Sequence, residues 1–139
     1  MKSWIRVITI AAVVTALAVP LAQGQKNRRG APSPKYNPAA EIRVKGTIHE
    51  VTFYVCPVSG GTGAHLRLNV KSQPMKIHLA PSWFVEKYGM KFRLGEQVEV
   101  IGVEYTRAGE IGLMARQMEG ATSIYSFRNP KGEPLWLQE

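Results

Sequence analysis

From Glu41 onward, apolar side chains recur at every second position, and this period of two predicts strands for most of the folded part of the chain. The alternation slips by one residue at His49-Glu50, and a second slip occurs near Ile101-Gly102. A slip within a long strand is what a β-bulge produces, and bulges bend strands sharply. Long, bent strands are typical of small closed barrels.

Two pairs of alternating stretches predict hairpins. A turn at Ser72-Gln73 sets residues 66–70 against 75–79, with all their apolar side chains on one face. The opposite face of this hairpin then pairs Arg67 with His78. A second turn at 107–109 sets Val103 opposite Leu113 in the same way.

The predicted element order is strand, loop, strand, strand, short helix, strand, strand. Ser82 is expected to cap the helix and Gly89 to end it. This is the order of the OB-fold, a five-stranded Greek-key barrel. We therefore predict a mainly β chain that forms a small five-stranded OB-like Greek-key barrel with one short helix. A C-terminal hairpin, with its turn at 129–132, completes the fold.

The N-terminal part of the chain predicts export from the cytoplasm. Residues 1–24 combine two basic residues, an apolar stretch and small residues before a cleavage point, which is the pattern of a secretory signal peptide. Residues 25–40 are basic and rich in proline, so they are expected to form a disordered linker. The barrel domain then covers 41–139. The protein is predicted to be periplasmic or secreted, with no stable membrane span after signal cleavage.

Charge and composition exclude several classes of function. The chain of 139 residues carries 18 Lys and Arg against 10 acidic residues, all of them Glu, but from Glu41 onward the counts are 12 and 10. The excess positive charge thus lies in the tail, whereas a nucleic-acid-binding protein carries it on the folded surface. A single cysteine excludes an internal disulfide and c-type haem attachment. No cofactor and no nucleic-acid partner are predicted.

A series of short motifs over residues 41–137 resembles a known family of small exported bacterial domains, the magnetosome MamS/MamX family. The motifs are Val44-x-Gly46-Thr47-Ile48, His65-Leu66-x-Leu68, Ile77-x-Leu79-Ala80-Pro81-x-Trp83-Phe84, Gly95-x-x-Val98-x-Val100-x-Gly102, Ala115-Arg116 and Arg128-Asn129-x-x-Gly132-x-Pro134-x-Trp136. The resemblance implies an OB-like periplasmic module. Some relatives carry CxxCH haem motifs, which this chain lacks, so haem binding is not implied. The family offers no catalytic residues to transfer.

The first candidate site is a polar face on the outside of the barrel. By strand parity, Tyr54, Arg67, Lys76 and His78 point outward together, on the surface that OB proteins commonly use for ligands. Cationic groups beside an aromatic ring favour an anionic or carbohydrate envelope ligand, or an acidic partner protein. This predicts a non-catalytic binding or assembly module of the bacterial cell envelope.

The alternative is a periplasmic metal-handling protein. Cys56 and His65 are expected to approach each other across a glycine-rich loop, with His78 as a further ligand. A thiolate with neutral imidazoles suits copper or zinc, and iron is a third option. Enzymatic activity is not predicted, because a Cys-His nucleophile also needs an oxyanion hole and an orienting group that the sequence does not reveal.

Overall fold

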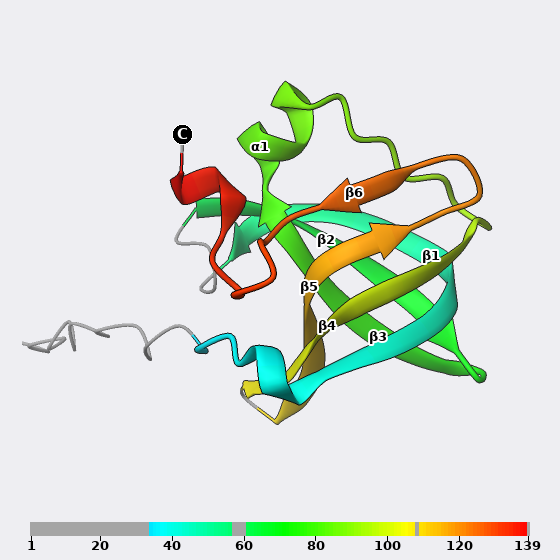
Figure 1. The fold of residues 1–139 in the computed structure, drawn as a ribbon. Coiled ribbons are helices and arrows are strands. Elements are labelled where there is room, and N and C mark those ends of the chain that lie inside the picture. Colours follow the sequence, from blue (N-terminus) through cyan, green and yellow to red (C-terminus); the bar gives the residue numbers. More distant parts are fainter. Residues whose placement is uncertain (1–33, 57–60, 108, 139) are drawn as a thin grey trace, which may run out of the picture.

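The alternating stretches fold into a single sheet that closes on itself (Figure 1). The computed structural model describes residues 34–56, 61–107 and 109–138. The elements in chain order are η1 (Pro38–Ala40), β1 (Glu41–Cys56), β2 (Gly61–Val70), β3 (Gln73–Pro81), α1 (Ser82–Lys87), β4 (Gln97–Arg107), β5 (Glu110–Glu119), β6 (Ile124–Ser126) and η2 (Leu135–Leu137). Within these residues, no helix has the length and apolar character needed to cross a bilayer. The predicted signal peptide lies outside the described part.

The strand order confirms the predicted OB-like fold. Neighbouring strands run β3-β2-β1-β4-β5-β6, and β3 also pairs with β5 in parallel, which closes the wall. All the other strand pairs are antiparallel. Strand β1 is long enough to pair with β2 through one half and with β4 through the other. The sixth strand, β6, lies in the first half of the predicted C-terminal hairpin and pairs with β5.

Both predicted slips of register occur. In β1 the pairing with β2 shifts between Ile48 and Glu50, so His49 is the extra residue. Between β4 and β5 the shift lies at Ile101/Gly102, where Arg116 of β5 is the extra residue. Gly46 allows β1 to approach its neighbour, since a Cβ there would lie 2.8 Å from a backbone oxygen of β2.

The turn between β2 and β3 differs from the prediction. Its two residues are Lys71 and Ser72, both with positive φ (48° and 65°), instead of Ser72-Gln73. The register is therefore displaced by two residues, and Leu68 pairs with Met75. Because side chains alternate with a period of two, this displacement keeps the same apolar residues on the inner face. It does change which polar residues stand opposite each other on the outer face.

The β4–β5 hairpin is displaced by one residue from the prediction. Arg107 pairs with Glu110, and Val103 pairs with Met114 instead of Leu113. A shorter turn than the predicted 107–109 accounts for the change. Both Val103 and Met114 are buried in this arrangement.

The core fills the inside of the barrel and the space beneath α1. It consists of buried apolar residues from every one of the first five strands together with α1 and the C-terminal segment: Val44, Ile48, Ala64, Leu66, Leu68, Ile77, Leu79, Ala80, Phe84, Val85, Val98, Val100, Leu113, Ala115, Met118, Phe127 and Trp136. The helix begins at Ser82 itself after Pro81, so the expected capping role of Ser82 is wrong. Gly89, with φ of 58°, follows the helix as predicted.

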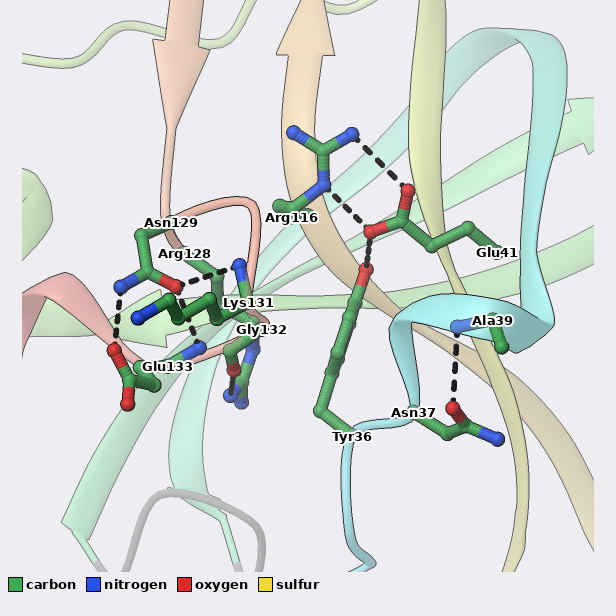
Figure 2. Close-up of polar contacts among 10 residues, drawn as sticks. All are labelled: Tyr36, Asn37, Ala39, Glu41, Arg116, Arg128, Asn129, Lys131, Gly132 and Glu133. Atoms are coloured by element: carbon green, nitrogen blue, oxygen red, sulfur yellow. Dashed lines mark hydrogen bonds and ion pairs between the residues drawn. The ribbon is translucent and has the colours of Figure 1, made fainter.

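Segments from both ends of the chain pack against the barrel. The C-terminal hairpin is confirmed by a bridge between Arg128 and Pro134 around the predicted turn. At the other end, the Tyr36 hydroxyl donates to Glu41, whose carboxylate pairs with Arg116 at 2.5 Å (Figure 2). Residues 36–40 therefore belong to the folded unit, and the linker predicted to reach residue 40 ends earlier.

Candidate metal centre

Three successive strands bring together the thiol and two of the three imidazoles of the chain. Cys56 ends β1, His65 lies in β2 and His78 lies in β3. His78 Nδ1 lies 3.3 Å from Cys56 Sγ and 3.1 Å from His65 Nε2. One ligand atom from each residue lies within 4.8 Å of both others, and all three residues are buried. The remaining histidine, His49, is exposed.

Strand geometry explains why the two histidines meet on the outside of the barrel wall. His65 and His78 are direct partners across β2 and β3. The residues next to them, Leu66 and Ile77, belong to the inner core, so the histidines leave the sheet on its other side. Directly opposed residues hold their Cβ atoms about 5 Å apart, which is within reach for two imidazole rings.

The end of β1 pairs with β2 and adds side chains to this outer face. Phe53 and Val55 are exposed, whereas Cys56 is buried and Tyr54 is partly buried. The strand thus turns its even-numbered side chains toward the histidines. The Tyr54 ring stacks on His65 with a centroid distance of 4.0 Å and an interplanar angle of 8°. As a result, His65 and His78 are 1% and 0% exposed, although they lie outside the barrel interior.

Hydrogen bonding fixes the protonation state of the cluster. His65 Nδ1 lies 3.1 Å from the Gly63 carbonyl oxygen, which can only accept, so this nitrogen carries the proton. In a neutral ring, Nε2 of His65 then bears a lone pair, and His78 Nδ1 donates to it. Among the described residues, no group hydrogen-bonds the other nitrogen of His78, Nε2. A bound metal would take the Nδ1 position once the His78 proton resides on Nε2.

The surroundings keep both imidazoles neutral. Burial lowers the pKa of His65 to about 4, assisted by the positive charge of Lys76. Burial, together with His65, Arg128 and Lys76, lowers the pKa of His78 to about 3. Neutral imidazole is the form that binds metals, so both rings are ready to coordinate at neutral pH.

Two cations border the cluster. The Lys76 ammonium lies 5.0 Å from the centre of the Tyr54 ring. On the other side, Arg128 is 8% exposed, donates to the Gly132 carbonyl oxygen, and lies 5.0 and 5.1 Å from the rings of Tyr36 and Trp136 (Figure 2 shows the Arg128 contact with Gly132). Burial lowers the pKa of its guanidinium. The charge of Lys76 is partly offset by its ion pair with Glu110 at 3.3 Å, so Arg128 is the main cation beside the cluster.

Three of the four residues predicted to form an open ligand face lie side by side: Arg67 and Lys76 are partners across β2 and β3, and Lys76 lies over the Tyr54 ring. Arg67 is paired with Glu50 at 3.2 Å and with Glu110 at 3.9 Å, and Lys76 is paired with Glu110 at 3.3 Å. His78 is buried against Cys56 and His65, with Arg128 of the C-terminal segment nearby, so its expected surface position is wrong. Binding of an anionic or carbohydrate ligand or an acidic protein at the remaining residues stays a prediction.

The sequence prediction of the alternative metal site named its residues but not their arrangement. Cys56 and His65 were expected to meet with His78 as a further ligand, and the structure shows that His78 is the residue that contacts both others. The predicted hairpin register placed Arg67 opposite His78, whereas the observed register places His65 there. The positive φ at the turn was the deciding feature. Neither Lys71 nor Ser72 signals it as Asn-Gly would.

Comparison with known proteins places this barrel in a family. The family model of the MamS/MamX magnetosome protein family matches residues 40–124. The chain belongs to this family. None of the curated proteins matches it. Among solved structures, it is similar to a chain of the S. pombe Stn1–Ten1 complex, with 15% identity and a TM-score of 0.47, over 68% of this chain and 81% of that one.

Proposed function

We propose that this member of the MamS/MamX family is an exported, non-catalytic module of the bacterial cell envelope that binds one transition-metal ion. The observation that carries the proposal is the buried group of Cys56, His65 and His78, with ligand atoms within 4.8 Å of one another. Export is supported by the signal-like residues 1–24. The metal role takes precedence over binding of an anionic or carbohydrate ligand at Arg67 and Lys76, because these two side chains already pair with glutamates.

The donor spacing suits a metal ion. Around a tetrahedral ion with bonds of ~2.0 Å to nitrogen and ~2.3 Å to sulfur, donor atoms lie ~3.3–3.6 Å apart. The two shortest donor distances, 3.1 and 3.3 Å, need to open by only a few tenths of an ångström. The third pair, Cys56 and His65, lies within 4.8 Å and would close by at most about 1.3 Å on binding. Thiolate and imidazole are ligands for copper and zinc, and a buried thiol that binds a metal loses its proton on binding.

Burial also supports the non-catalytic assignment. The thiol and both rings are almost inaccessible to water, so an organic substrate has no direct approach to them. A metal ion, by contrast, is small enough to enter through a small movement of the side chains around the cluster. We therefore expect retention of an ion and no turnover of a substrate.

Metal titration of the purified, reduced protein tests the proposal. After incubation with Zn²⁺ or Cu⁺ and removal of loosely bound ions, elemental analysis is expected to find one ion per chain. Competition with a chelator should show that Cys56→Ser and His65→Gln each lower the affinity by about 100-fold or more, the scale on which loss of even an outer partner of a ligand is felt.

The matched control is His49→Gln, which removes the exposed histidine and should leave the affinity unchanged. Circular dichroism of each variant establishes that it is folded. Equal metal retention by the wild type and by the folded Cys56→Ser variant would contradict the proposed function.

A further inference from the structure

We propose that the ion is copper and that the centre exchanges single electrons, with Met114 as a fourth, weak donor. This inference rests on the proposed function and adds to it the identity and redox role of the metal. The donor set would be one thiolate, two imidazoles and one thioether. That combination is the ligand set of blue-copper electron-transfer sites, in which two His and one Cys bind in a plane and a Met sulfur lies at a longer axial distance.

Sheet pairing places Met114 beside the cluster. It is the partner of His78 across the parallel β3–β5 junction, so both side chains leave the wall on the same side. Met114 is 1% exposed but does not belong to the inner core, in contrast to Leu113 and Ala115 on either side of it. A thioether is therefore buried next to the imidazole that contacts both other ligands.

Charge around the site favours copper over zinc or iron(II). The group of possible ligands among the described residues contains no carboxylate, and Lys76 and Arg128 both act on His78 with positive charge. A thiolate neutralises Cu(I) fully but leaves Zn(II) or Fe(II) with one excess positive charge near the buried Arg128 guanidinium. Soft sulfur ligands independently favour Cu(I), and divalent copper binds most strongly of the first-row divalent ions.

The surrounding structure suits transfer of an electron without rearrangement of the ligands. His65 is held by the Gly63 carbonyl oxygen on one edge and by the Tyr54 ring on its face. These second contacts fix the ring whichever oxidation state is bound. Cu(II) gains one electron from an external one-electron carrier and becomes Cu(I), and the reverse step returns it. No proton moves, and all four donors stay in place.

Because Tyr54 is partly exposed while it stacks on His65, its ring connects the buried site to the surface. The copper itself stays away from water. An external carrier would therefore dock near Tyr54 and Lys76 and not reach the metal directly.

Anaerobic addition of Cu²⁺ to the reduced, metal-free protein tests the inference by visible spectroscopy. An intense charge-transfer band from thiolate to Cu(II) is expected, bleached by ascorbate and restored by ferricyanide over repeated cycles. Cys56→Ser should abolish the band. Met114→Leu, which conserves side-chain volume, should keep copper bound with less than about tenfold loss of affinity and raise the reduction potential, because an apolar neighbour favours the less charged Cu(I).

The remaining outcomes separate the two proposals. Tight binding of Zn²⁺ or Cu⁺ without a reversible Cu(II) band would overturn the redox inference and leave the proposed function intact. A band and a potential that are unchanged in Met114→Leu would overturn the role of Met114. Failure to retain any of these ions would overturn both the inference and the proposed function.

Discussion

The two sides of the barrel wall are buried to the same degree, but one side is apolar and the other carries metal-ligating side chains. In β3, Ile77 and Leu79 face the apolar core, while His78 between them faces Cys56 and His65. All five residues are at most 3% exposed. On the inner side, burial removes apolar area from water and stabilises the fold. On the outer side, burial keeps imidazoles neutral and holds polar atoms at coordinating distances, so the same strand carries stability on one face and chemistry on the other.

The largest effect is expected from a truncation on the inner side. Leu66→Ala leaves a cavity in the core, where the side chain is fully buried, and should lower the free energy of unfolding by about 4 kcal/mol. Urea denaturation measures this change. The exposed Leu94→Ala is the control, with an expected effect within about 0.5 kcal/mol. A loss below about 1 kcal/mol at Leu66 would mean that the inner face does not carry the stability.

The buried histidine on the outer side should make the stability of the protein depend on pH. His78 has a folded pKa of about 3, well below the usual 6.5, so the unfolded chain binds more protons between these values. Metal-free protein should therefore be most stable above pH 6.5 and lose stability as the pH falls toward 3. Between pH 6.5 and 4.5, His78 alone should account for a loss of about 2 kcal/mol.

Urea denaturation across this pH range checks the sign and the source. The His78→Gln variant should lose about 2 kcal/mol less than the wild type on acidification, because its amide does not titrate. His49→Gln, at an exposed position, should follow the wild-type curve. If the stability of the wild type and of the His78 variant fell equally with pH, the burial of His78 would not be what keeps its imidazole neutral.

A smaller effect is expected where the N-terminal segment joins the outer side. Tyr36→Phe removes only the hydroxyl that donates to Glu41, a carboxylate whose pKa is lowered chiefly by its hydrogen bonds with Arg116. The loss of stability should be about 1 kcal/mol. Arg116→Lys, which gives up the two-atom contact with Glu41, offers a comparison at the same network. Wild-type stability of Tyr36→Phe would place residues 36–40 outside the folded unit.

The smallest effect should come from the β2–β3 turn, which aligns the two histidines. Lys71 and Ser72 both adopt positive φ, a conformation that Asn-Gly accommodates better. The double change Lys71→Asn, Ser72→Gly is expected to stabilise the protein by about 0.5–1 kcal/mol with unchanged metal affinity. A lower metal affinity together with a higher stability would contradict this prediction. It would show that the backbone conformation of the turn affects the geometry of the site.

The fold was predictable from the sequence because the alternation of apolar and polar residues assigns each side chain to a face of the sheet, even when the register is shifted by two residues. Displacing the β2–β3 register by two residues leaves Leu66, Leu68 and Ile77 on the inner face, so the barrel follows from alternation even when the turn is misplaced. The slips at His49-Glu50 and Ile101-Gly102 likewise mark bulges that the structure contains. The N-terminal boundary was missed because Tyr36 is fixed by Glu41 and Arg128, contacts that composition does not report.

The candidate site was only partly predictable because it depends on which residues pair across β2 and β3. A two-residue shift in register changes these pairs but leaves the alternation of the side chains between the two faces unchanged. The same two-residue change that leaves the core intact replaces Arg67 by His65 as the partner of His78. Burial of the outer face was also not evident from alternation. It arises from side chains of other segments: the Tyr54 ring from β1 stacks on His65, and Arg128 from the C-terminal segment lies near His78. These contacts depend on the folded chain and not on any single strand.

The extra residue in β3 has a consequence for how such barrels diversify. Between the pairs Ala64–Ala80 and His65–His78, Leu79 has no partner in β2. A relative that lost this single position would keep its two imidazoles face to face, because their pairing continues without interruption from the turn at Lys71-Ser72 and the extra residue lies beyond it. What would shift is the end of β3, from Ala80 to Pro81, and with it the entry into α1. The pairing of the ligands and the attachment of the helix are therefore set by separate parts of one strand, so a relative can vary the second and keep the first.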